Sequence, residues 1–280
     1  MNRLNDKRVR KNIVLDTETA PYYEKVKPYE KRGFKSLEEL PRDARDVKEY
    51  FYKEKPYFSC VTSVKQTQLI FDIGWTVCDK QGNIFKKRNF LVEEVFTNME
   101  LMRHAHYFNK YPQYLKMLQK GSIKMLPWIE VMRKMEDDII QYDIKNLYAY
   151  NMAFDKRAIY ETARVIGKRE PYFFKYEGVK FHCLWGMACE TILLRKMFFK
   201  IAKENRWFSE KGNIKTSAEV CYRYISNNYD FEESHTALDD SIIETAILAK
   251  VLRAKQKMSW GIIPQPWRIV QEYGKARGWI

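Results

Sequence analysis

The feature that most constrains the fold is a short apolar run near the start of the chain that ends in two acidic residues. Ile13, Val14 and Leu15 are consecutive branched apolar residues, typical of a strand buried on both faces of a parallel or mixed sheet. Asp16 and Glu18 follow, and we expect their side chains on one face because directions along a strand repeat every two residues. Two adjacent carboxylates repel each other unless a cation lies between them, which indicates a Mg²⁺ or Mn²⁺ site. An isolated Asp-x-Glu is more often a solvated strand end, so this hypothesis needs partners elsewhere in the chain.

Composition narrows the class of protein. The chain has 280 residues, of which 45% are hydrophobic and 31% charged, typical of a folded protein with a sizeable core. Its net charge of +14 favours polyanionic partners, of which nucleic acid is the commonest, although a merely basic surface is the alternative. Five cysteines without a Cys-x-x-Cys pair fit free thiols in a reducing compartment and argue against a zinc ribbon. Without an apolar signal segment or membrane-length apolar run, we expect a cytoplasmic protein, in a cell or its host.

The periodic segments predict an α/β domain. Residues 68–77 and 83–92 are predicted strands that flank a turn-forming cluster, and together they predict an antiparallel hairpin beside the first strand. We found no internal repeat or long linker, so we predict one domain over 1–257, followed by an apolar tail over 258–280 that folds back onto it. We further expect a short strand at 147–150 and helices over 97–142, 151–167, 215–225 and 236–255.

Residues 20–67 form an insertion that follows neither the strand nor the helix period cleanly. The segment is rich in tyrosine and charge and contains four prolines, and a short helix over 37–52 is predicted within it. Basic residues interleaved with aromatic ones suit single-stranded nucleic acid, but a segment that merely packs on the body is an equal alternative. The insertion begins two residues after Glu18, so we expect it to leave close to the acidic pair and to be able to roof it.

Two further motifs provide the partners that the first acidic pair needs. One lies where the strand at 147–150 meets a helix, and the other opens the last strong helix. In chain order the three motifs are Asp16-Thr17-Glu18, Asn151-Met152-Ala153-Phe154-Asp155 and His235-Thr236-Ala237-Leu238-Asp239-Asp240. With Asp72-Ile73-Gly74 in the hairpin, this set resembles the DEDDh exonucleases of the DnaQ-like superfamily, over about residues 11–253 apart from the insertion.

The resemblance implies a ribonuclease-H-like fold, with a mixed central sheet flanked by helices, and 3′–5′ exonuclease activity on DNA or RNA. We expect single-stranded 3′ ends as substrate and nucleoside 5′-monophosphates as products. Phosphodiester hydrolysis requires an activated water and neutralisation of developing charge, which two divalent ions supply. An imidazole that accepts a proton near neutral pH suits a general base, the role of the histidine in this family. The candidate metal ligands are Asp16, Glu18, Asp155 and Asp240; His235 completes the catalytic set; Thr17, Thr19, Asn151 and Phe154 are candidates for substrate contact.

The last motif offers two adjacent acids for one metal-ligand position, and the chain also departs from the family pattern in two places. Asp239 and Asp240 lie about 100° apart around a helix, so only one can face the metals easily. The family spacing selects Asp240 and leaves Asp239 as a charge favoured by the helix dipole. The family commonly has a histidine where this chain has Tyr150, and it lacks the long insertion. These departures leave the chemistry intact but put the choice of substrate in doubt.

Two rival functions remain open at this level. A ribonuclease-H-like integrase or resolvase would share the fold and the acids but would lack the His-x-Ala-x-x-Asp spacing. A nucleic-acid-binding module without catalysis belongs to a different class, and the presence of all five polar groups argues against it. Basic charge gives affinity but no preference for DNA or RNA, so the sugar, the strandedness, the oligomeric state and any replication or repair partner stay open.

Overall fold

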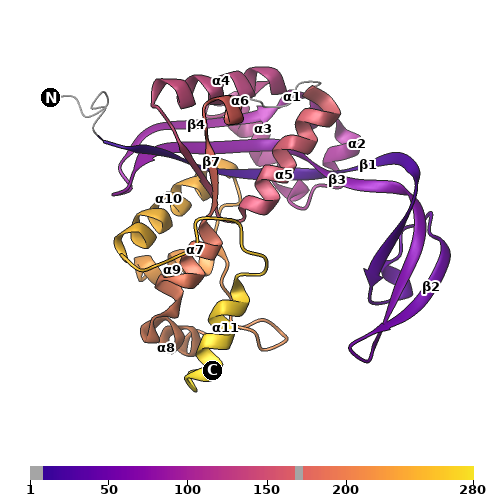
Figure 1. Cartoon of the computed structure of the whole chain (residues 1–280). Helices are drawn as coiled ribbons and strands as arrows, with labels where there is room; N and C mark the ends of the chain where they lie inside the picture. Colours follow the sequence, from indigo (N-terminus) through magenta and orange to yellow (C-terminus); the bar gives the residue numbers. More distant parts are fainter. Residues whose placement is uncertain (1–8, 168–172) are drawn as a thin grey trace.

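The computed structural model describes residues 9–167 and 173–280, which build a seven-stranded mixed β-sheet with helices on both faces (Figure 1). The strand order is β5-β4-β3-β1-β6-β7, with β2 paired to the other part of β3. β3 runs antiparallel to β1, β2 and β4, whereas β5 is parallel to β4 and β6 is parallel to β1 and β7. The mixed α/β sheet and the hairpin beside the first strand are therefore confirmed. The strands are β1 (Lys11–Phe34), β2 (Arg45–Tyr52), β3 (Lys55–Asp79), β4 (Ile84–Val92), β5 (Lys124–Leu126), β6 (Asn146–Ala149) and β7 (Lys180–Cys183).

The helices form two layers with separate apolar cores. Ile13 and Leu15 of β1 pack with side chains of α1 to α6, whereas Val14 packs with side chains of α7 to α11 on the other face. This alternation is the reason that the run contains no polar residue, since both faces of the strand are buried. The helices are α1 (Glu93–Phe96), α2 (Met99–Met102), α3 (Tyr111–Gln119), α4 (Trp128–Gln141), α5 (Met152–Thr162), α6 (Phe173–Tyr176), α7 (Leu184–Glu190), α8 (Lys196–Glu204), α9 (Ala218–Ser226), α10 (Ala237–Arg253) and α11 (Trp267–Ala276).

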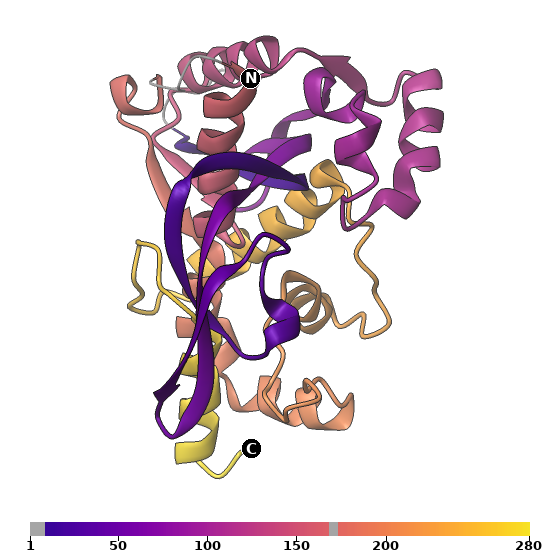
Figure 2. The same ribbon diagram turned by 90° about the vertical axis from the view of Figure 1, so that its right-hand side faces the viewer.

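The insertion over 20–67 is a β-sheet arm that projects from the body (Figures 1 and 2). β1 and β3 continue through it as a long antiparallel pair, and β2 adds a third strand. The predicted helix over 37–52 is wrong: Leu37–Glu39 forms one 3-10 turn, and the residues from Arg45 onward form β2. Pairing with β3 overrides the local pattern here, and the rings of the cross-strand pair Tyr50 and Tyr57 stack at 6.0 Å. Nearly every side chain of β2 is exposed, so this part of the arm does not pack on the body.

The helical prediction over 97–142 is also wrong in its middle. Residues after α3 turn at Gly121, whose φ of +67° favours glycine, and then pair with β4 as β5 before Pro127 starts α4. The predicted helix over 151–167 is α5 followed by a π-helical turn over Ala163–Gly167. Helices α9 and α10 lie within the predicted ranges to within a residue.

The C-terminal tail lies against α8 and the core below the sheet. Val270 of α11 is fully buried, and a Cβ on Gly274 would lie 2.4 Å from the ring of Phe199, so the helix approaches α8 too closely for a larger residue there. No helix in the described part of the chain is both long and apolar enough to cross a membrane.

Candidate active site and metal centre

The predicted catalytic residues line one cavity of about 390 Å³ at the point where β1 extends past the end of β6. β6 pairs with β1 at Ile13 and Val14 and ends at Ala149, so the neighbouring side of β1 is open beyond that point. Such crevices at the carboxyl ends of parallel strands commonly bind ligands. Of the residues predicted from the sequence, Asp16, Thr17, Glu18, Asn151, Phe154, Asp155, His235 and Asp240 line the cavity.

Thr19, predicted to contact substrate, and the insertion over 20–67, expected to be able to roof the acidic pair, do not line this cavity. The hydroxyl of Thr19 donates to the Oε1 of Gln68 at 3.2 Å. The register between β1 and β3 shifts directly after Glu18, where Phe71 of β3 is the extra residue. Thr19 is not among the described residues that line the cavity, and neither is any residue of the arm. Bulges of this kind often occur beside active sites, where they redirect side chains.

β1 presents its polar residues to two different helices. Val14 packs in the same core as α10, so the two-residue repeat brings Asp16 and Glu18 out on the α10 side. Thr17 emerges on the α5 side, where its hydroxyl donates to the Oδ1 of Asp155 at 2.7 Å. This hydrogen bond orients the carboxylate of Asp155 at the end of the strand, so residues from both faces of the sheet meet in one cavity.

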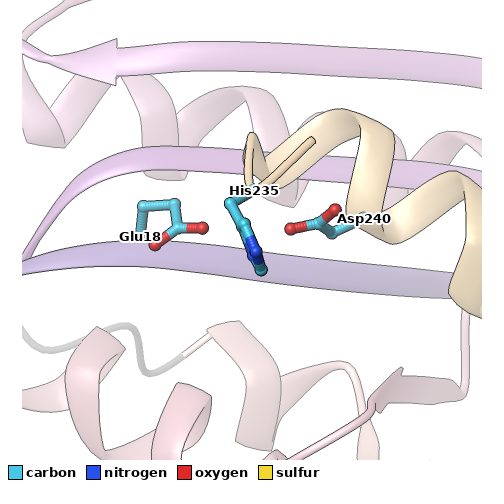
Figure 3. Close-up of side chains that lie close together, drawn as sticks. All are labelled: Glu18, His235 and Asp240. Carbon is cyan, nitrogen blue, oxygen red and sulfur yellow. The ribbon is translucent and has the colours of Figure 1, made fainter. Parts of the chain in front are cut away.

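Glu18, His235 and Asp240 form the closest group in the cavity (Figure 3). One ligand atom from each lies within 4.8 Å of the other two, although the three residues come from β1, the loop before α10 and α10 itself. Asp239 points elsewhere: its Oδ2 accepts a hydrogen bond from the hydroxyl of Thr236 at 2.8 Å, and its side chain is exposed. Asp240 is therefore the acid that α10 contributes to the cavity.

The hairpin positions the start of α10. The Oδ2 of Asp72 accepts from the backbone N–H of Ala237 at 3.0 Å and from the hydroxyl of Tyr114 at 2.8 Å. A carboxylate at a helix N-terminus satisfies a free N–H and complements the helix dipole. Next to it, a Cβ on Gly74 would lie 2.2 Å from the backbone nitrogen of Leu238, so only glycine lets α10 approach β3 this closely.

The carboxyls of the cavity have raised pKa values because burial removes them from water. Burial, followed by the charge of Asp72, raises the pKa of Glu18 to about 9. Burial, followed by the charge of Glu233, raises that of Asp240 to about 8. The pKa of Asp155 rises to about 7 through burial, against the opposing hydrogen bond from Thr17. Clustered shifts of this size in a cavity are typical of functional sites.

Glu233 and Glu244 are two further carboxylates that line the cavity and that the motifs did not indicate; of these, Glu244 is the more buried. It is 2% exposed, lies one helical turn after Asp240, and accepts a hydrogen bond at Oε2 from the backbone N–H of Tyr150 at 3.1 Å. Burial, followed by the charge of Glu244, raises the pKa of Asp16 well above its usual value. Burial, followed by the charge of Asp155, raises the pKa of Glu244 well above its usual value. The sequence feature that could have indicated Glu244 is its spacing of four residues from Asp240, which places both acids on one face of α10.

His235 is held as a neutral ring. Burial, and then the positive charge of Lys110, lower its pKa below the usual value. Its ring stacks on Tyr107 at a centroid distance of 4.5 Å, and its Nδ1 lies 3.8 Å from the Oε2 of Glu233. Lys110 donates from Nζ to the carbonyl of Ser234, which ties down the loop that carries the histidine. A neutral imidazole at pH 7 can accept a proton.

The donors in this cavity fit a hard divalent cation. Six carboxylates and one imidazole line it, and no lysine or arginine is present among the described lining residues. Burial raises the pKa values of these carboxyls, so their charged forms are disfavoured in the metal-free cavity. Mg²⁺ and Mn²⁺ prefer carboxylate oxygens and would supply positive charge.

Comparison with known proteins adds no relative. The chain matches no protein-family model, and no curated protein matches it. The sequence motifs and the geometry of the cavity are therefore the basis of the function proposed below.

Proposed function

We propose that this protein is a metal-dependent 3′–5′ exonuclease of the DEDDh type, on a ribonuclease-H-like fold, that hydrolyses DNA or RNA from single-stranded 3′ ends. The observation that carries the proposal is the convergence of three sequence motifs in one cavity. Glu18, His235 and Asp240 approach within 4.8 Å of one another there, and Asp16 and Asp155 line the same walls. The mixed sheet with β1 at its centre also supports the fold assignment.

Asp16, Glu18, Asp155 and Asp240 would hold two Mg²⁺ or Mn²⁺ ions. When bound, such ions polarise a water and neutralise charge on the phosphate. The protein contributes the base: with the proton of the neutral His235 ring on Nδ1, the Nε2 atom is left to accept a proton from that water. The packing of the ring on Tyr107 fixes its orientation.

The size of the cavity favours the end of a strand over its interior. A volume of about 390 Å³ falls within the ~300–1,000 Å³ range of pockets that enclose small ligands, which suits a terminal nucleotide. Asn151 is exposed and Phe154 half-buried on its wall, so both are available to contact that nucleotide. Single nucleoside 5′-monophosphates are the products that the DEDDh resemblance implies for this site.

The test uses single-stranded DNA and RNA oligonucleotides labelled at the 5′ end, with Mg²⁺, Mn²⁺ or EDTA. We expect the labelled strands to shorten one nucleotide at a time and to release monophosphates when Mg²⁺ or Mn²⁺ is present, and to stay intact in EDTA. A phosphorothioate at the last linkage should block the reaction, and Asp155→Asn should abolish it. Cleavage of circular strands would instead identify an endonuclease, and binding without hydrolysis in either metal would identify a binding module.

A further inference from the structure

We propose that a second pocket beside the carboxylate cavity binds a nucleobase of the substrate strand; this inference rests on the proposed function. The pocket has a volume of about 450 Å³ and lies between α7, the segment 208–218 and the start of α11. Trp185 and Trp267 contribute its aromatic walls, so we name it the tryptophan pocket. Its volume lies in the range of about 300–1,000 Å³ that encloses small ligands.

The tryptophan pocket adjoins the carboxylate cavity. Tyr150, Asn151 and Ala218 line both of them. Asn151 is exposed at the boundary and lies four residues before Asp155, at the start of α5. A group bound in the tryptophan pocket would therefore lie on the other side of these shared residues from a nucleotide bound at the carboxylates, an arrangement that suits two units of one strand.

The aromatic wall formed by Trp185 is rigid before any ligand binds. Its indole Nε1–H donates to the hydroxyl of Thr216 at 2.9 Å, and its ring stacks on Tyr150 with an interplanar angle of 19°. The hydroxyl of Tyr150 donates in turn to the carbonyl of Thr216 at 2.7 Å. A preorganised ring loses little conformational entropy on binding, and every base has a π-face that can stack on an indole.

The charges of the two cavities differ in sign. Among the described residues that line the tryptophan pocket there is no carboxylate, and Lys215 is the one cation, exposed at its edge. Apolar aromatic walls beside a single positive charge suit a base that is attached to a phosphate. The carboxylate cavity suits the metal and the scissile phosphate, whereas the tryptophan pocket suits a base of the same strand.

The test measures binding of 5′-fluorescein single-stranded oligonucleotides by anisotropy, in Asp16→Asn protein, which prevents hydrolysis. Strands lacking the base at the first, second or third position from the 3′ end are compared with an intact strand. We expect one abasic position to weaken binding about 10-fold. Trp267→Leu, which keeps apolar bulk, should weaken binding of the intact strand by a similar factor and make binding insensitive to that abasic position. Trp267→Phe should retain most of the affinity.

Trp260→Ala is the matched control, because this residue is a 49% exposed tryptophan of the same tail that does not line the pocket. It should bind every strand like the parent protein, and thermal melting should show that each variant is folded. The proposal is overturned if Trp267→Leu binds the intact strand like the parent protein. It is also overturned if Trp267→Leu and the abasic position each weaken binding independently, because two groups in contact should not give additive losses.

Binding is measured without hydrolysis, so the two proposals can fail separately. If Trp267→Leu removes the abasic effect but wild-type protein releases no monophosphates, the pocket is supported and the exonuclease is refuted. If wild-type protein releases monophosphates but Trp267→Leu binds like the parent, the exonuclease is supported and the pocket is refuted.

Discussion

Binding of Mg²⁺ or Mn²⁺ to the carboxylate cavity should release protons. The metal-free cavity holds protons at neutral pH because burial raises the pKa values of its carboxyls, to about 9 for Glu18, about 8 for Asp240 and about 7 for Asp155, with repulsion from neighbouring carboxylates adding to the rise for Glu18 and Asp240. A metal ligand must be deprotonated, so each carboxyl that coordinates the ion gives up its proton. The affinity for metal therefore depends on pH.

The expected magnitude follows from those three pKa values. At pH 7, Asp155 is about half protonated, Asp240 about nine-tenths and Glu18 almost fully, so these three ligands together release about two protons when metal binds. They release about three at pH 5 and about half a proton at pH 9. Asp16, whose pKa burial raises well above its usual value, adds to this release. By linkage, the association constant rises at least about 100-fold per pH unit near pH 7.

Isothermal titration calorimetry with Mn²⁺, in buffers of equal pH but different ionisation enthalpy, measures the release directly. Glu18→Gln should lower the release at pH 7 by about one proton. Asp239→Asn should change it much less, because the side chain of Asp239 is exposed and bonds Thr236 outside the cavity, and its charge contributes less than burial and Glu233 to the raised pKa of Asp240. A release near zero at pH 7 in wild-type protein, with Mn²⁺ bound, would refute the reasoning.

The same shifts give the sign of the pH dependence of stability without metal. Each carboxyl has a higher pKa in the folded protein than in the unfolded chain, so between about pH 4 and pH 9 the native state binds more protons. The free energy of unfolding then falls as pH rises through this window. In EDTA, Tm should decrease from pH 5 to pH 8, and Mn²⁺ should restore it; a rising Tm in EDTA would contradict the raised pKa values.

The remaining predictions concern α10 and its loop. Asp240→Asn should abolish metal-dependent hydrolysis, while Asp239→Asn keeps most of it, and the reverse result in an oligonucleotide assay would exchange their roles. His235→Ala should lower turnover about 10²-fold or more with Mn²⁺ binding retained, and loss of binding in calorimetry would argue against the base role. Gly74→Ala should destabilise the protein by ~1–3 kcal/mol in urea unfolding, because its Cβ would meet the backbone of Leu238 at 2.2 Å; unchanged stability would disprove the close approach.

The parts of the fold that the sequence predicted are those with a strong local pattern. The apolar run before Asp16 predicts the start of β1, and the turn-forming cluster predicts the end of β3 and the start of β4, each within a few residues. The sequence did not predict that β1 and β3 continue through the arm to Phe34 and from Lys55. The predictions failed where a distant partner supplies the hydrogen bonds. β2 forms because β3 pairs with it, and β5 forms because β4 lies beside it, although neither segment has a strong strand period of its own.

The candidate site divides in the same way. Motif spacing indicated Asp16, Glu18, Asp155, His235 and Asp240, and the structure brings all five to one cavity. The sequence did not indicate Glu244, which meets the backbone of Tyr150, nor that Thr19 bonds Gln68 instead of lining the cavity, because both outcomes depend on contacts with distant segments of the chain. No local pattern reports such contacts.

The amino-acid sequence by itself determined which side chains share a face. The two-residue repeat of β1 sends Asp16 and Glu18 to the same side, because covalent geometry sets side-chain direction within an element. Packing of the two cores decided which elements meet. α10 lies on Gly74 and brings in Asp240, and the tail places Trp267 in the lining of the same pocket as Asn151, 116 positions earlier in the chain. Such long-range placement arises from burial of apolar surface over the whole chain, which no short segment encodes.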